Sequence, residues 1–217
     1  QIFKRYQHED DRIKIIHNEK NMKLAASLNH CLKEARGIYI ARMDDDDIAL
    51  PERFEKQVDF LERNPEYSVV GSNAKISDGN RITGIRCCKE CPEKSDVLFG
   101  PPYIHPSIMM RKDVYDRLDG YTVASRTKRG QDWDLWFRFY AAGLKGYNIQ
   151  VPLIIYHEGP DDYKKRTFQT ALGYTKNAVN GYKLLKVPFW KYVFAVKPII
   201  SYLIPETIKK NVRHEKL

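Results

Sequence analysis

Apolar positions alternate between a helical spacing and a strand spacing over the first part of the chain. After Asn21, a residue type that caps helices, apolar side chains recur every three or four positions as far as Gly37, which suits a helix end. The apolar run 38–43 follows directly and predicts a strand. Because strand, helix and strand alternate here, the pattern favours an α/β fold with a mainly parallel sheet flanked by helices.

The same periodicities continue to residue 156. Pro51 opens a further helix, which Asn64 and Pro65 end. The remaining predicted elements are strands at 12–16, 67–76, 81–86, 108–110 and 151–156 and helices at 112–118 and 133–142. Two segments, 87–103 and 122–130, carry turn-forming or charged residues. We expect both to be irregular and the second to be mobile.

The pattern changes near residue 161. We therefore predict a first domain over residues 1–160 and a basic helical extension over residues 161–217. Within the extension, residues 168–185 keep a helical period, and an apolar run that contains lysines follows Pro188. This run is too short and too interrupted for a clean membrane span. It fits a helix lying on an anionic membrane surface through residues 183–217, or equally a tail packed on its own domain.

The composition shows that positive charge is concentrated near the C-terminus and indicates the redox state of the cysteines. The 217-residue chain has a net charge of +9, and residues 183–217 hold eight Lys or Arg against two Glu. A nucleic-acid-binding module is the rival class for such a charge, but the basic residues collect in the tail and no recognition motif is present, so we predict no nucleic-acid partner. Four cysteines without a secretory signal or a second CxxC pair indicate reduced thiols and a cytoplasmic protein, peripheral to the inner face of the membrane if the tail binds lipid.

The most distinctive stretch is Asp44-Asp45-Asp46-Asp47, directly after the predicted strand 38–43. Adjacent carboxylates repel one another, so a folded chain keeps them where solvent or a cation screens the charge. Carboxylates at the end of a strand lie where open α/β sheets bind ligands, and oxygen ligands suit Mg²⁺ or Mn²⁺. A solvated acidic turn is the competing interpretation. An EF-hand is excluded, because Ile48 stands where it needs an oxygen ligand and Ala49 stands where it needs the turn-forming Gly.

Polar residues also mark three other predicted junctions: His105, Gln131-Asp132 and His157. Junctions at one edge of a sheet can converge in space although they are far apart in sequence. A cation at the aspartates and a carboxylate at Asp132 would form a group-transfer site, in which the cation faces a leaving phosphate and the carboxylate takes a proton. Sugar transfer and nucleotidyl or phosphoryl transfer both fit such a site.

At these residues the chain resembles glycosyltransferase family 2, whose members have the GT-A fold. The segment Ala35 to Asp47, with its strand and aspartates, is similar to the family's DxD region, and Gln131-Asp132-Trp133 resembles the start of its ED-containing helix. Between them, Ile104 to Arg111 is similar to the family's middle segment. The resemblance implies an inverting transfer of a sugar from a nucleoside-diphosphate sugar to a hydroxyl of a glycan or lipid-linked acceptor, in polysaccharide biosynthesis.

The resemblance also implies roles for single residues. Asp132 matches the catalytic base, and Asp44, Asp45 and Asp46 match the DxD motif. Asp46 is the expected direct metal ligand, and His157 is a further candidate ligand. Asp47 is expected to support the metal ligands or to cap the helix that Pro51 opens. The resemblance places acceptor contacts at three residues, His105, Gln131 and Trp133.

Two departures from the family pattern qualify these expectations. The family's Glu before the base is Gln131 here, which removes a charge beside Asp132. The family's first strand, helix and strand, which bind the nucleotide base and ribose, have no counterpart before Gln1. We therefore expect an N-terminally truncated GT-A domain that lacks its first βαβ unit, binds donor weakly and has little or no activity alone.

Overall fold

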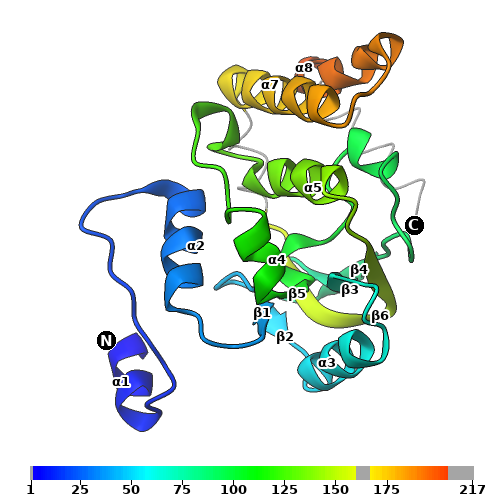
Figure 1. Ribbon diagram of the computed structural model, residues 1–217. Coiled ribbons are helices and arrows are strands. Elements are labelled where there is room, and N and C mark those ends of the chain that lie inside the picture. Colours follow the sequence, from blue (N-terminus) through cyan, green and yellow to red (C-terminus); the bar gives the residue numbers. More distant parts are fainter. Residues whose placement is uncertain (1, 160–166, 205–217) are drawn as a thin grey trace.

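The computed structural model describes residues 2–159 and 167–204. Its sheet has the strand order β1-β5-β3-β6-β2, and β4 pairs with β3 beyond the end of β5. The strands are β1 (Tyr39–Ala41), β2 (Ile48–Ala49), β3 (Val69–Ser77), β4 (Ile82–Arg86), β5 (Met109–Arg111) and β6 (Gly146–His157). Figure 1 shows β3 and β6 at the centre of the sheet.

The sheet is mixed, but the expected parallel majority is wrong. Only the central pair β3–β6 is parallel, and the other four pairings of the described strands are antiparallel. The difference has a physical cause: β3 turns directly into β4 through a hairpin at Gly79, whose φ of +95° suits the tight turn. Strand direction depends on long-range pairing, which local periodicity does not report.

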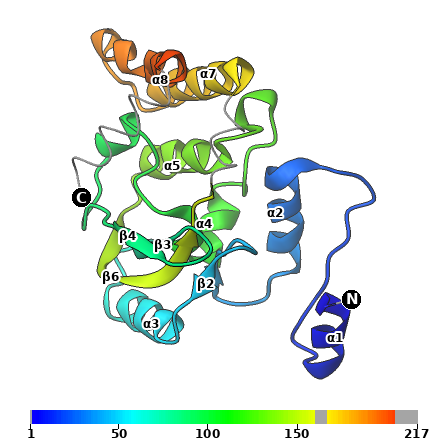
Figure 2. The same ribbon diagram turned by 180° about the vertical axis from the view of Figure 1, so that it is seen from behind.

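Helices cover both faces of the sheet because alternate strand residues point to opposite sides. Val70 and Met109 face α3 (Arg53–Arg63), where Leu61 is fully buried. Their neighbours Val69 and Met110 face the larger core on the other side. That core is built on α5 (Gln131–Ala141), which lies between the sheet and the C-terminal helices in Figures 1 and 2. Two further helices flank it, α2 (Lys23–Glu34) and α4 (Lys112–Arg117).

The C-terminal helices pack onto this core. They are α7 (Phe168–Leu184), the 3₁₀ segment η4 (Phe189–Val196) and α8 (Lys197–Leu203). Ala178, Tyr182 and Ala195 belong to the same buried cluster as α5, and the Tyr182 hydroxyl donates to the carbonyl of Leu98 at 2.6 Å. The predicted domain boundary falls within residues 160–166, outside the described residues, so the division into two domains stays a prediction.

Two other segments differ from the sequence-based expectation. Residues 12–16 form no strand, and no described strand lies alongside to pair with them. The segment 122–130 contains a short 3₁₀ turn, η3 (Ser125–Thr127), where only irregular chain was expected, and hydrogen bonds tie it to α5 and α7. Its mobility stays a prediction. Preceding all of these, α1 (Ile2–Glu9) buries no residue and stands apart from the other elements in Figures 1 and 2.

Two more 3₁₀ segments, η1 (Asp96–Leu98) and η2 (His105–Ser107), interrupt the irregular chain between β4 and β5. Nowhere in residues 2–159 or 167–204 does a helix combine the length and apolarity that crossing a membrane requires.

Candidate active site

Residues 42–47, the aspartate loop, connect the two edge strands of the sheet order β1-β5-β3-β6-β2. The loop leaves β1 after Ala41 and enters β2 at Ile48, and these two strands stand at opposite ends of the order. Carboxylate oxygens of Asp44, Asp46 and Asp47 lie within 4.8 Å of one another. Three oxygen ligands at this separation are a donor set suited to Mg²⁺ or Mn²⁺.

Asp47 is the buried member of this group. One of its carboxylate oxygens accepts a hydrogen bond from the backbone N–H of His157 at 2.9 Å, and the other has no hydrogen-bond partner among the described residues. Burial raises the pKa of Asp47 to about 6, against the lowering effect of the His157 N–H. A buried carboxylate oxygen without a partner is what a divalent cation would complete, so these residues fit a metal.

Two predicted residues lie outside the carboxylate group. Asp45 is exposed and is not among the three clustered aspartates. The His157 imidazole lies beside the β3–β4 turn, where a Cβ on Gly79 would sit 3.1 Å from its Cε1. The backbone of His157 thus supports Asp47, and a metal contact through its side chain stays a prediction. The burial of Asp47 had no clear sequence signal beyond its place next to the β2 residue Ile48.

Asp132 stands in the first turn of α5, where free backbone N–H groups favour a negative charge. Burial raises the pKa of its carboxyl, Asp44 raises it further, and the N–H of Trp133 and the Arg42 guanidinium lower it. Gly130 caps the start of the helix, and its φ of +87° is the left-handed conformation that glycine adopts readily. The result is a half-buried carboxylate held at a helix start, a suitable place for a general base.

A cavity of about 600 Å³ joins the aspartate loop to Asp132. The predicted residues Asp44, His105, Gln131 and Asp132 all line it, although they come from distant parts of the sequence. Arg42 lines it as well. The convergence of the strand and helix ends, expected from the sequence, is therefore present in the folded chain.

Arg42 is the residue that sequence reasoning missed. Its side chain is 7% exposed and forms an ion pair with the carboxylate of Asp44. The same positive charge lowers the pKa of Asp132 and of His105. A single arginine after an apolar strand is the only sequence signal for it, and that pattern alone does not separate a buried ion pair from a solvated one.

His105 is fully enclosed beside the cavity. Its Nε2 lies 2.9 Å from the hydroxyl of Tyr121, and its Nδ1 has no hydrogen-bond partner among the described residues. Burial lowers the pKa of His105 well below its usual value, so the ring is neutral and can accept or donate a hydrogen bond. His105 lines the cavity, and its contact with an acceptor stays a prediction.

Trp133 lies elsewhere. Its indole N–H donates to the carbonyl of Val97 at 2.6 Å, and its ring packs against Phe137 and Tyr174. It lines neither the cavity of about 600 Å³ nor a second cavity of about 1130 Å³ that also borders Asp132. The geometry places Trp133 in the core, and a contact with acceptor through its ring stays a prediction without structural support.

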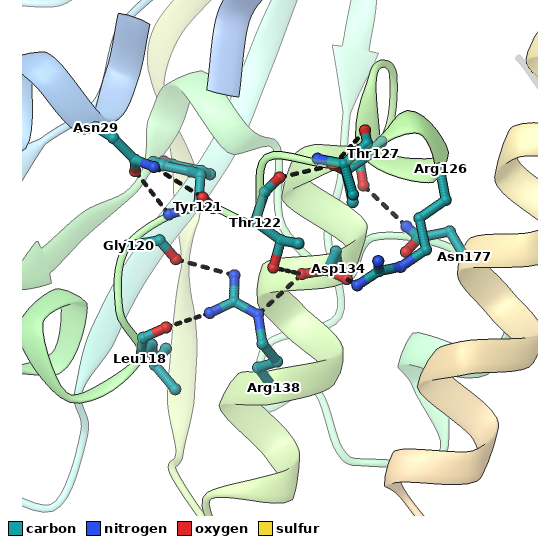
Figure 3. Close-up of polar contacts among 12 residues, drawn as sticks. Asn29, Leu118, Gly120, Tyr121, Thr122, Arg126, Thr127, Asp134, Arg138 and Asn177 are labelled. Atoms are coloured by element: carbon teal, nitrogen blue, oxygen red, sulfur yellow. Dashed lines mark hydrogen bonds and ion pairs between the residues drawn. The ribbon is translucent and has the colours of Figure 1, made fainter. Parts of the chain in front are cut away.

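A network centred on Asp134 holds the segment that leads to Asp132 (Figure 3). The buried Asp134 carboxylate pairs with Arg126 at 3.0 Å and with Arg138 at 2.8 Å, and it accepts a hydrogen bond from the Thr122 hydroxyl at 2.6 Å. Arg138 also donates to the carbonyls of Leu118 and Gly120. Because these contacts tie the loop to α5, the approach to Asp132 is fixed in place.

The fold is the GT-A fold of known glycosyltransferase structures. Residues 2–159 and 167–204 resemble the structure of S. aureus TarS 1–349 in complex with UDP-GlcNAc, with a TM-score of 0.63 and 12% identity over 94% of this chain and 68% of that one. The mannosyltransferase PcManGT from Pyrobaculum calidifontis, in complex with GDP-Man and Mn²⁺, matches with a TM-score of 0.58 and 12% identity over 98% of this chain and 65% of its own.

Sequence comparison gives the family. The profile of glycosyl transferase family 2 matches residues 1–119. EpsE of Bacillus subtilis (strain 168) is 41% identical over 96% of this chain and 77% of EpsE, and the amylovoran biosynthesis glycosyltransferase AmsE of Erwinia amylovora is 31% identical over 78% of this chain and 62% of AmsE. The chain belongs to glycosyl transferase family 2, whose members are inverting enzymes. This decides for sugar transfer over the nucleotidyl transfer that the carboxylate motif also allowed.

Proposed function

We propose that Asp132 is the base of an inverting sugar transfer, and that Asp44, Asp46 and Asp47 hold Mg²⁺ or Mn²⁺ at the donor diphosphate. The observation that carries this proposal is the single cavity lined by both Asp44 and Asp132. When bound, the cation supplies positive charge next to the leaving diphosphate. His157 remains a further candidate ligand, and Asp45 a candidate contact to the nucleotide.

Side chains of the protein take the proton of the acceptor hydroxyl and orient the acceptor. The acceptor hydroxyl oxygen forms a bond to the anomeric carbon on the face opposite the leaving group, and the bond from that carbon to the diphosphate oxygen breaks. The hydroxyl proton passes to the carboxylate of Asp132. Arg42 keeps Asp132 ionised and holds Asp44 in place. His105 and Gln131, both at the cavity, orient the acceptor.

The relatives support the proposed classes of donor and acceptor. The structural neighbours are complexes with UDP-GlcNAc and with GDP-Man, which supports a nucleoside-diphosphate sugar donor. Sequence relatives include enzymes of amylovoran and O-antigen biosynthesis and a galactosyltransferase whose named acceptor is a diphosphoundecaprenol-linked sugar. These names support a glycan or lipid-linked acceptor in polysaccharide biosynthesis.

Replacing the base tests the mechanism. After a screen of common nucleotide sugars identifies the donor, Asp132→Asn should lower kcat by about 10²–10⁴-fold, the usual contribution of a general base. Metal-dependent donor binding, measured by calorimetry, should stay within twofold of the wild type. Asp116→Asn on α4 is the matched control. Comparable turnover by Asp132→Asn and the wild type would contradict the assignment.

We also propose that the protein binds peripherally to the cytoplasmic face of a membrane. The η4 and α8 segments expose large apolar side chains, with Phe189 82%, Trp190 65% and Leu203 69% exposed. Residues 183–204 contain four lysines and no Asp or Glu. Exposed aromatic residues among cations suit an anionic lipid surface.

Vesicle sedimentation tests this location. The wild type should bind vesicles that contain anionic phospholipid more tightly than neutral ones, and Phe189→Ser/Trp190→Ser should lose most of that binding. The exposed pair Ile82→Ser/Ile85→Ser on β4 is the control. Equal vesicle binding by the wild type and the Phe189→Ser/Trp190→Ser variant would refute the proposed contact.

A further inference from the structure

A second cavity, of about 1130 Å³, lies on the other side of Asp132. It is formed by the start of α2, the loop before α5 and the first turns of α7. The two cavities share Leu24, Gln131 and Asp132 among their lining residues. The proposed base therefore lines two cavities, one that Asp44 of the aspartate cluster also lines and one that none of the three clustered aspartates lines.

The second cavity is strongly basic. Among the described residues, its charged lining consists of five cations, Lys23, Arg126, Lys128, Arg129 and Lys176, and one carboxylate, Asp132. Arg126 is compensated by Asp134. The other four cations form no ion pair with any residue in 2–159 or 167–204. Uncompensated cations around a concave surface raise the local concentration of anions.

The loop that carries Lys128 and Arg129 is anchored on both sides. Before these residues, the Thr127 hydroxyl donates to the carbonyl of Thr122 at 2.6 Å. After them, the carbonyl of Gly130 accepts from the side chain of Asn177 on α7 at 3.0 Å. Figure 3 shows Arg126 and Thr127 held between α5 and α7. The two cations are thus presented from a fixed backbone, which lowers the entropy lost when a ligand binds.

We propose that this basic cavity binds the phosphate or diphosphate group of an anionic acceptor, whose hydroxyl reaches Asp132. The inference rests on the proposed transfer, since both use the same base. The donor's own diphosphate belongs at the clustered aspartates, in the other cavity. Lysine and arginine together are the usual binders of phosphate oxygens, and a diphosphate carries more charge than the single carboxylate of a sugar acid.

A binding measurement tests the site without any transfer. Inorganic pyrophosphate is titrated into the full chain in EDTA, so that no divalent cation can recruit it to the aspartates. Lys128→Gln/Arg129→Gln should bind it at least tenfold more weakly than the wild type. The control Lys33→Gln/Lys145→Gln removes two exposed charges away from the cavity and should bind like the wild type. Equal affinity of the two double variants, or no metal-free binding by the wild type, would overturn the proposal.

A kinetic measurement separates the possible sources of the phosphate. One acceptor sugar that the wild type glycosylates is offered free, as its 1-phosphate and as a short-chain polyprenyl diphosphate. Lys128→Gln/Arg129→Gln should raise the KM of the phosphorylated acceptors about tenfold, with kcat and the donor KM within twofold. If the wild type has a lower KM for the 1-phosphate than for the free sugar, the site binds phosphate itself. If only the polyprenyl diphosphate has a lower KM than the free sugar, the site binds a lipid diphosphate headgroup. A raised donor KM would overturn the proposal, and if no acceptor is glycosylated the proposed function fails while the pyrophosphate titration still decides this site.

Discussion

The buried guanidinium of Arg42 forms an ion pair with the carboxylate of Asp44, at the wall of the cavity that Asp132 also lines. In the proposed mechanism the two carboxylates have different tasks, because Asp44 would meet the cation and Asp132 would take the proton. One arginine acts on both. Arg42 compensates part of the negative charge of the aspartate loop and lowers the pKa of Asp132. The aspartate loop and the proposed base are therefore electrostatically linked.

The first prediction concerns the pH dependence of transfer. Burial raises the pKa of Asp132 above the ordinary value of an aspartate. A base must be ionised to accept a proton, so kcat should fall as pH falls through this raised pKa, and the acidic limb should lie above the range of an exposed carboxyl. A pH profile of kcat at saturating substrates measures the limb. A limb at the position of an ordinary aspartate would show that another group is titrating.

The second prediction isolates Arg42. Removing its charge in Arg42→Met takes away a factor that lowers the pKa of Asp132, so the acidic limb should move to higher pH. Arg42→Lys keeps a positive charge and should move the limb less. Arg42→Met leaves the carboxylate of Asp44 without its partner, but that side chain is 36% exposed, so the free energy of unfolding should fall by only about 1 kcal/mol, which chemical denaturation reports separately. An unmoved limb in Arg42→Met would contradict the link between Arg42 and the base.

The third prediction contrasts two neighbouring aspartates. Asp47 belongs to the group of three carboxylates and Asp45 does not. Asp47→Asn should therefore weaken Mn²⁺ binding about tenfold or more, while Asp45→Asn should stay within twofold. Calorimetry with Mn²⁺ in the presence of a nucleoside diphosphate measures both, and EDTA should abolish donor binding in the wild type. The reverse ranking of the two variants would place the metal contact at Asp45 instead.

Local sequence patterns predicted most of the helices and strands, because their causes are local, but they missed α1 and wrongly predicted a strand at 12–16. The glycine after the second helix, Pro51 at the start of the third and the apolar period of 133–142 act within a few residues of themselves. The convergence of Asp44 and Asp132 was also predictable, since strand and helix ends meet at the edges of α/β sheets. The residue roles carried by the family resemblance added Asp132 as the expected base.

The remaining features depend on contacts between distant segments. The direction of β5 and β2 is set by their partners across the sheet. The burial of Asp47 depends on the backbone of His157, 110 residues away in sequence. The composition of the loop 122–130 predicts irregular chain, but hydrogen bonds to Asp134 and Asn177 tie it to two helices. No periodicity or spacing within the loop reports these partners.

The fourth prediction tests that network. Asp134 is 4% exposed at its side chain and pairs with two arginines that are 29% and 21% exposed. Asp134→Asn leaves both cations without their partner, so it should lower the free energy of unfolding by about 2–4 kcal/mol, somewhat below the loss for fully buried pairs because the arginines are partly solvated. The control Asp116→Asn removes a carboxylate that is 65% exposed and pairs with Lys112, and should cost at most about 0.5–1 kcal/mol.

Urea denaturation measures the difference between the two variants. The same network holds the backbone that leads to Asp132, so Asp134→Asn should also lower kcat under conditions where the variant is fully folded, whereas Asp116→Asn should not. Arg126 and Arg138 contact Asp134 through separate oxygens, so each single arginine variant should cost less stability than Asp134→Asn. Equal stability losses for Asp134→Asn and Asp116→Asn would mean that the loop is held by Asn177 and the backbone contacts of Thr127 alone.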